Sequence, residues 1–169
     1  MVILVTGGIA SGKSAVCGYL ESKGYPVYDS DSRTKALYRN VPGLKERVEK
    51  AIGVPFSRVR VIFEYPEKRR ALEEIVYPLV VEDFVKWRDA QESDILFLES
   101  AIALDKREFD GLYDRVWLVC APVQQRLARN PHTAERAVTQ RLPDYSEADQ
   151  IIINDSSLES LYDKIDKLI

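Results

Sequence analysis

The stretch Gly7-Gly8-Ile9-Ala10-Ser11-Gly12-Lys13-Ser14 decides the fold of this chain, because it has the spacing G-x-x-x-x-G-K-[ST]. It follows the apolar run Val2-Ile3-Leu4-Val5, which predicts a buried strand. Apolar residues then recur at helical spacing, at Ala15, Val16, Tyr19 and Leu20. A strand, a glycine-rich loop and a helix in this order are typical of the phosphate-binding loop, the P-loop. The alternative, a glycine-rich turn that holds no ligand, explains neither the strand before it nor the helix after it.

The chemistry of phosphate binding accounts for the spacing. Gly7 and Gly12 allow backbone angles closed to other residues and let the chain approach a ligand closely. Successive N–H groups then form an anion-binding concavity at the positive end of the helix dipole. Lys13 is expected to reach the β- and γ-phosphates, and the Ser14 hydroxyl is expected to bind Mg²⁺. The predicted nucleotide-binding residues of the loop are Gly8, Ile9, Ala10, Ser11, Gly12, Lys13, Ser14 and Ala15.

Length and composition exclude several classes of protein. The chain has 169 residues, which suits one domain, and a net charge of −3, which argues against a nucleic-acid partner. No apolar stretch approaches the length of a membrane span. The first residues already form the predicted strand and leave no room for a signal peptide, so a cytoplasmic protein is expected. Cys17 and Cys120 lack metal-ligand spacing and are expected to pack in the core.

Strand and helix patterns alternate along the chain, which predicts a parallel sheet covered on both faces. The fold class is therefore α/β, a three-layer α/β/α arrangement of the P-loop NTPase type with five parallel strands. We expect a single domain over 1–169, with a helical insertion on the acceptor side at about 32–92 and a small helical lid at about 123–142. Pro78 is expected to divide the helical pattern that resumes at Glu67 into two helices.

Three carboxylates directly follow predicted strands, where ligands of open α/β sheets bind. Asp29 and Asp31 follow the second strand, and Glu99 ends the central strand 95–98. Asp31 is the candidate general base, although either aspartate can instead cap the helix that follows. Glu99 is expected to hold a water on Mg²⁺ or to contact the acceptor, the alternative being an exposed residue at a strand end.

Arginines are concentrated in the segment of the predicted lid, at Arg126, Arg129, Arg136 and Arg141. Mobile cations that close over the phosphates neutralise the charge that develops during phosphoryl transfer. We assign this role to Arg129 and Arg136, while at least two of the four are expected to be solvated surface residues. His132, the only histidine, is expected to lie at the surface.

With these residues in place, the chain resembles the dephospho-CoA kinase family over nearly its whole length. The P-loop is close to that family's T-G-G-I-G-S-G-K-S, and four further family patterns follow in order: D-x-D, L-E-x-I-x-H-P, R-L-x-x-R with R-x-x-x-Q, and A-D-x-V-I-x-N. The matching segments here are Thr6–Ser14, Val27–Asp31, Leu72–Pro78, Arg126–Arg129 with Arg136 and Gln140, and Ala148–Asn154. In addition, Leu98–Ile102 is similar to the third-strand segment of some bacterial members.

The resemblance implies a kinase that uses ATP and Mg²⁺ to phosphorylate the ribose 3′-hydroxyl of dephospho-CoA, in the synthesis of coenzyme A. It implies that Asp31, Lys13 and Arg136 act in catalysis and that Asn154 lies near the adenine; Asp29, Tyr77 and Glu99 are assigned to the acceptor. A monomer or weak oligomer is expected.

The chain departs from the family pattern on the acceptor and lid sides. Tyr77 replaces the family's histidine, the segment between Ile52 and Glu67 is short, and the lid has lost residues around Asn130. Two alternatives therefore stay open: a kinase for another nucleotide-like acceptor, and a paralogue that binds nucleotide without turning over.

Overall fold

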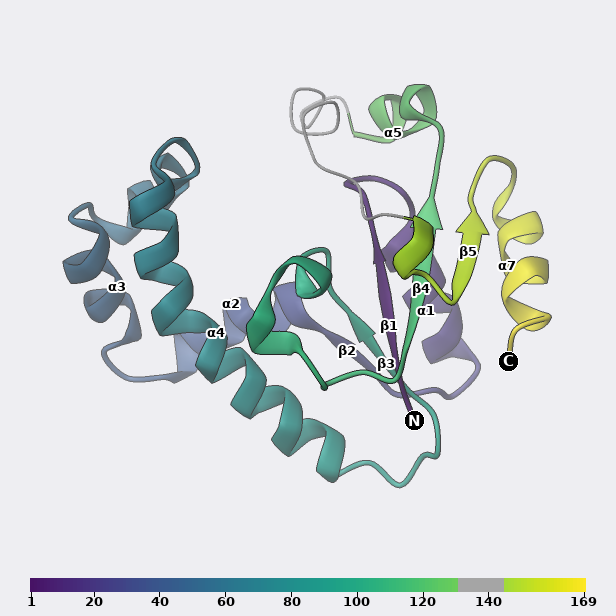
Figure 1. The fold of residues 1–169 in the computed structure, drawn as a ribbon, viewed down its shortest axis with the longest axis horizontal. Coiled ribbons are helices and arrows are strands. Elements are labelled where there is room, and N and C mark those ends of the chain that lie inside the picture. The colour runs from purple at the N-terminus through teal and green to yellow at the C-terminus, as the bar shows by residue number, and fades with distance from the viewer. Residues whose placement is uncertain (131–144) are drawn as a thin grey trace. The chain divides into compact units, whose positions relative to one another are not determined.

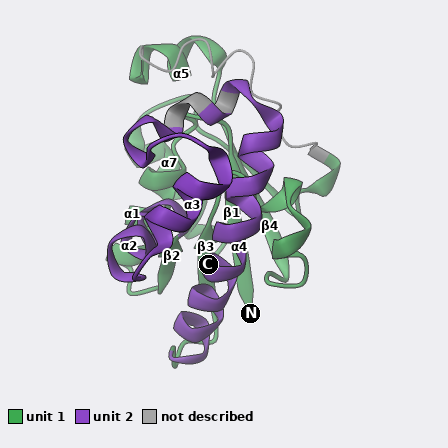
Figure 2. Cartoon of the chain, turned by 90° about the vertical axis from the view of Figure 1, so that its left-hand side faces the viewer, with its two compact units in different colours: residues 1–29, 91–169 green, residues 30–90 purple. Residues whose placement is uncertain are grey.

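The computed structural model describes residues 1–130 and 145–169. They form two compact units, which Figure 2 distinguishes by colour: residues 1–29 with 91–169, and residues 30–90. Most of the predicted lid, with Arg136, Arg141, Gln140 and His132, lies outside the described residues.

The first unit is built on a parallel sheet in the order β2-β3-β1-β4-β5, with the loop-bearing strand in the middle (Figure 1). The strands are β1 (Val2–Gly7), β2 (Val27–Asp29), β3 (Leu96–Glu99), β4 (Arg115–Cys120) and β5 (Gln150–Ile153). Every residue of β1 is buried, as the apolar run Val2-Ile3-Leu4-Val5 predicts for a central parallel strand. The five parallel strands of the predicted α/β class are confirmed.

Two helices cover one face of this sheet, namely α1 (Lys13–Ser22) and α7 (Leu158–Asp166). Their apolar faces pack on alternate strand residues and form a core of Ile3, Val5, Val16, Cys17, Leu20, Phe97, Trp117, Val119, Ile152, Leu161 and Ile165. Ser157 caps α7, because its Oγ accepts a hydrogen bond from Ser160 N at 3.2 Å. Both described cysteines are free, and Cys17 is buried in this core as predicted.

Shorter elements complete the first unit. Two 3₁₀ turns, η2 (Ala103–Asp105) and η3 (Arg107–Phe109), follow β3, and helix α5 (Val123–Arg129) lies beyond the carboxyl end of β4 (Figure 1). A further turn, η5 (Tyr145–Glu147), precedes β5.

The second unit is helical, with α2 (Ser30–Asn40), α3 (Leu44–Ile52), the 3₁₀ helix η1 (Phe56–Glu64) and α4 (Pro66–Asp89). An ion pair joins α2 to α4, since Arg33 Nε and Nη2 each donate to Asp83 at 2.7 Å. Helix α3 buries Leu44, Val48 and Ile52, one residue on each successive turn.

The prediction that Pro78 divides α4 into two helices is wrong, because α4 runs through it for 24 residues. Proline removes one backbone donor from a helix, a cost that tertiary packing can outweigh. Here Val76, Tyr77, Val80 and Phe84 are buried on either side of Pro78, so the packing of the apolar face holds the helix together.

No helix in the described part of the chain is long and apolar enough to cross a bilayer.

Candidate nucleotide-binding site

The loop between β1 and α1 adopts a conformation that only its glycines permit. Gly7 has φ of +145° and Gly12 has φ of +107°. A Cβ at Gly7 would collide with the carbonyl oxygen of Val119, and one at Gly12 with the side-chain amide of Asn154. Ala10 also has a positive φ, 59°, a conformation that costs a non-glycine residue about 1 kcal/mol or more. Backbone strain of this kind is concentrated at ligand-binding sites, which makes the loop a candidate binding site.

Lys13 lies across the mouth of this loop. Its Nζ donates to the carbonyl oxygens of Gly7 at 3.1 Å and of Gly8 at 3.2 Å. The N–H groups of the first turn of α1 have no acceptor within the helix, which makes this end of α1 positive. An ammonium group and a helix N-terminus at one loop form a site for a polyanion.

On one side of the loop, Ser14 contacts a carboxylate. Its Oγ donates to Glu99 Oε1 at 3.1 Å, and strand pairing sets Glu99 beside both Val5 of β1 and Asp29 of β2. Burial raises the pKa of the Glu99 carboxyl, an effect that Lys13 opposes and Asp29 reinforces. Burial also raises the pKa of the Cys17 thiol, an effect that Glu99 reinforces. The structure thus brings together Lys13, Ser14, Asp29 and Glu99, which the sequence placed at the ends of three different strands.

Ser14 and Glu99 provide two oxygen atoms of the kind that bind a magnesium ion. Mg²⁺ prefers hard oxygen ligands and usually keeps several waters while binding one or two protein groups and the substrate phosphates. Among the described residues no group of three or more histidine, cysteine, aspartate or glutamate side chains is placed to hold a metal. One hydroxyl and one carboxylate therefore suit an ion that arrives with its nucleotide.

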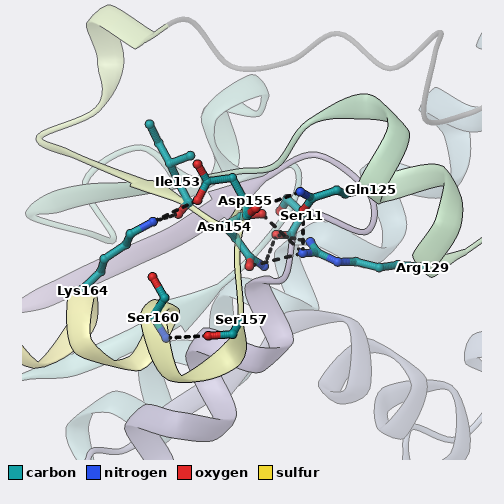
Figure 3. Close-up of polar contacts among 9 residues, drawn as sticks. All are labelled: Ser11, Gln125, Arg129, Ile153, Asn154, Asp155, Ser157, Ser160 and Lys164. Carbon is teal, nitrogen blue, oxygen red and sulfur yellow. Dashed lines mark hydrogen bonds and ion pairs between the residues drawn. The ribbon is translucent and has the colours of Figure 1, made fainter.

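On the other side of the loop, side chains from α5 and from the end of β5 bind the loop backbone (Figure 3). Arg129 Nη1 lies 3.3 Å from the carbonyl oxygens of both Ala10 and Ser11, and Asn154 Nδ2 donates to the Ser11 carbonyl at 2.8 Å. Arg126 Nε donates to the Ile9 carbonyl at 2.7 Å.

Arg126 is the contact that the sequence analysis did not assign to the site. Its side chain is 2% exposed, which is unusual for arginine and shows that it is not one of the solvated residues. In the sequence, Arg126 was marked by the resemblance to the family's R-L-x-x-R pattern and by its position one helical turn before Arg129, and neither signal says what its side chain contacts.

Two further predicted site residues, Asp31 and Tyr77, belong to the second unit. Asp31 is exposed in the first turn of α2, two residues after the end of β2. Tyr77 is 9% exposed, and its hydroxyl donates to Glu73 Oε1, one turn earlier in α4, at 2.9 Å. Arg136 lies outside the described residues.

A parallel sheet with this strand order, and a P-loop between its central strand and α1, defines the class of P-loop kinases. Two solved structures have the same fold: a dephospho-CoA kinase from Campylobacter jejuni (TM-score 0.67, 18% identity, 99% of this chain and 94% of that one) and a shikimate kinase from Aquifex aeolicus (TM-score 0.51, 19% identity, 99% and 95%). The chain belongs to the dephospho-CoA kinase family, whose model matches residues 1–53 and 57–159.

Individual relatives agree with this assignment. The dephospho-CoA kinase of Porphyromonas gingivalis is 36% identical over 148 residues, covering 80% of this chain and 73% of the relative. That of Thermosynechococcus vestitus is 30% identical over 188 residues, covering 96% and 90%. The crystal structure of TT1252 from Thermus thermophilus superimposes with a TM-score of 0.81 at 30% identity, covering 99% of this chain and 95% of that one. The predicted family and fold are confirmed. As a member of this family, the chain is a phosphotransferase with a hydroxyl group as the acceptor.

Proposed function

We propose that this protein transfers the γ-phosphoryl group of ATP to the ribose 3′-hydroxyl of dephospho-CoA and so produces coenzyme A. The observation that carries the proposal is the family match, which extends over 1–53 and 57–159 and therefore includes segments on both the nucleotide and the acceptor sides. The geometry of the P-loop supports the nucleotide half of the reaction independently.

The chain's own groups divide the work on the nucleotide. Lys13 exchanges its bonds to the Gly7 and Gly8 carbonyls for the β- and γ-phosphates, and the N–H groups of the loop bind the remaining oxygens. Ser14 and Glu99 would hold Mg²⁺, directly and through a water, and the ion supplies positive charge to the phosphate oxygens when bound. Arg129 and Arg136 add cationic charge from the lid side.

On the acceptor side, Asp31 removes the proton of the attacking hydroxyl. Its exposed position in the first turn of α2 leaves the carboxylate accessible to a substrate. Asp29 and Glu99 are the further groups that we assign to the acceptor, whereas the burial of Tyr77 and its bond to Glu73 favour a role within α4 over the acceptor contact expected from the sequence. We also propose that the protein works in the cytoplasm as a monomer or weak oligomer, without a nucleic-acid or membrane partner.

A coupled assay of ADP release tests the proposal. ATP with dephospho-CoA should give rapid turnover, whereas a panel of nucleoside monophosphates should give little. Preference for a nucleoside monophosphate would reassign the acceptor, and ATP binding without turnover on any acceptor would identify a non-catalytic paralogue. The product should be checked by mass spectrometry, because ADP release alone also reports hydrolysis by water.

A further inference from the structure

Side chains from outside the P-loop bind three consecutive carbonyl groups at its tip. Ile9, Ala10 and Ser11 accept, respectively, from Arg126, from Arg129 and from both Arg129 and Asn154. None of these donors lies in the P-loop motif. The motif therefore does not contain everything that fixes its own conformation.

Binding a carbonyl group also orients the N–H group that follows it. The peptide unit is planar and trans, so the C=O of one residue and the N–H of the next point in opposite directions. With their carbonyls held toward α5 and β5, the Ile9 and Ser11 peptide units turn the N–H groups of Ala10 and Gly12 to the opposite side, whereas the Ser11 N–H already donates to the Gly8 carbonyl at 3.2 Å. Ala10 is held in its unfavourable positive φ by the same contacts. Preorganised N–H groups bind an anion without reordering when it arrives.

Asn154 is held at several points. It is 4% exposed, its backbone N donates to the Cys120 carbonyl at 2.7 Å, and its Oδ1 accepts from Arg129 Nη2 at 3.3 Å. Because Oδ1 faces the guanidinium, Nδ2 is the atom left to face the loop, and it lies next to Gly12.

The turn that carries Asn154 is fixed on both sides (Figure 3). Gln125 Nε2 donates to the Asp155 carbonyl at 2.9 Å, and Lys164 Nζ lies 3.2 Å from Asp155 Oδ1. α5 thus holds the Asn154 side chain, while β4, α5 and α7 hold the backbone of Asn154 and its neighbours, which gives the rigidity that a positioning residue needs.

We infer that Asn154 is a positioning residue for phosphate binding, which acts by holding the Ser11 carbonyl so that the loop N–H groups face the triphosphate. The inference rests on the proposed use of ATP and differs from a role in recognising adenine. A residue that positions the loop affects the binding of every ligand that carries the phosphates. A residue that recognises the base affects only the binding of nucleotides, and it affects different nucleotides differently.

Two substitutions of Asn154 test this, with inorganic tripolyphosphate as a probe that has no base. Asn154→Asp keeps an oxygen for Arg129 but replaces the donor, and Asn154→Leu keeps the approximate size without a donor or a charge. For both variants, the KM for ATP, the KM for GTP and the inhibition constant of tripolyphosphate should rise together by about 5- to 20-fold, the effect of losing one buried hydrogen bond. Asn40→Asp and Asn40→Leu, exchanges at the exposed end of α2, are the matched controls and should change none of them.

Each other outcome is decisive. A higher KM for ATP with an unchanged inhibition constant for tripolyphosphate, or a changed preference between ATP and GTP, would overturn the inference in favour of base recognition. Unchanged constants in folded variants would overturn it as well. Asn154→Ser, a smaller change, replaces either variant that loses its cooperative melting transition. If the unsubstituted protein binds neither ATP nor tripolyphosphate, the proposed function itself fails.

Discussion

Lys13 shows at the scale of one residue how the site is prepared for its ligand. Its ammonium bonds to the Gly7 and Gly8 carbonyls, partners that phosphate oxygens can replace at the same distance. Because an ammonium group binds an ionised phosphate oxygen more strongly than a neutral carbonyl oxygen, this exchange favours the bound nucleotide. Lys13 is the first residue of α1 and is not a member of the apolar core.

Lys13→Ala should therefore weaken ATP binding by about 10- to 100-fold, the range for a hydrogen bond to a charged group, with little change in melting temperature. Calorimetric titration with ATP measures the first quantity, and thermal unfolding the second. Lys86→Ala is the control, because it removes the same charge from an exposed i,i+4 pair with Glu82. ATP binding unchanged in Lys13→Ala would contradict the assignment of the loop.

Asp31 is the residue on which catalysis depends in the proposed mechanism. Asp31→Asn keeps the size of the side chain and much of its ability to cap α2 but removes the proton acceptor. Turnover should fall by about 10²- to 10⁴-fold while ATP affinity is nearly kept, as single-turnover kinetics and titration would show.

The control for Asp31 is Asp89→Asn, at the last residue of α4, where the carboxylate bonds only to its neighbour Arg88 among the contacts described. This variant should keep full turnover. Unchanged turnover in Asp31→Asn, together with a lower melting temperature, would show that Asp31 only caps its helix.

The site residues that belong to one short sequence motif could be predicted from their spacing. The side chains that reach the loop from distant segments of the chain could not. The spacing of Gly7, Gly12, Lys13 and Ser14 follows from the chemistry of a phosphate loop, and the structure places Ser14 against Glu99. Arg126 gave no such signal, because its function depends on which carbonyl its helix faces. The resemblance indicated a nucleotide role for Asn154, yet only the structure shows its contact with Ser11.

At the scale of elements, helix α4 departs most from the pattern that its sequence suggests. Pro78 predicts a break, but the buried residues before and after it keep one continuous helix. Local helix propensity favours a break at Pro78, whereas tertiary packing favours a continuous helix. Packing prevails because the many apolar contacts of the helix outweigh one missing hydrogen bond. The first strand and the strand at 95–98, whose apolar runs and packing agree, were predicted within a few residues of the bounds of β1 and β3.

Tyr77 precedes this proline, and its surroundings favour a role in α4 itself. The ring is buried and the hydroxyl donates to Glu73, which also accepts from Arg69 Nε at 2.8 Å. Tyr77→His should lower the free energy of unfolding by about 1–3 kcal/mol, since imidazole neither fills the space of the phenol ring nor reaches Glu73. The KM for dephospho-CoA should stay the same.

Tyr77→Phe separates the contribution of the ring to stability from that of the hydroxyl. It keeps the ring and loses only the hydroxyl, which should lower the free energy of unfolding by about 1 kcal/mol. Urea unfolding gives both free energies, and steady-state kinetics gives both KM values. A lower KM for dephospho-CoA in Tyr77→His, with the KM for ATP unchanged, would instead establish that this position contacts the acceptor.

At the scale of the whole molecule, the chain separates into a sheet unit and a helical unit. Alternating strand and helix patterns predicted the parallel sheet, since parallel strands require crossover connections. They did not predict the order β2-β3-β1-β4-β5, because the same alternation is compatible with several orders and only side-chain packing selects one. The second unit is inserted in the sequence between β2, an edge strand of the sheet, and β3.

This division predicts that the two substrates protect different parts of the chain from hydrogen exchange. ATP alone should slow exchange in the P-loop and at Asn154, because binding suppresses the local opening that exposes these amides. Dephospho-CoA should add protection within residues 30–90, the unit that contains Asp31 and Tyr77. Mass spectrometry of peptic fragments resolves the units, and the Lys13→Ala variant should lose only the protection by ATP. Protection by dephospho-CoA confined to residues 1–29 and 91–169 would show that the helical unit does not bind the acceptor.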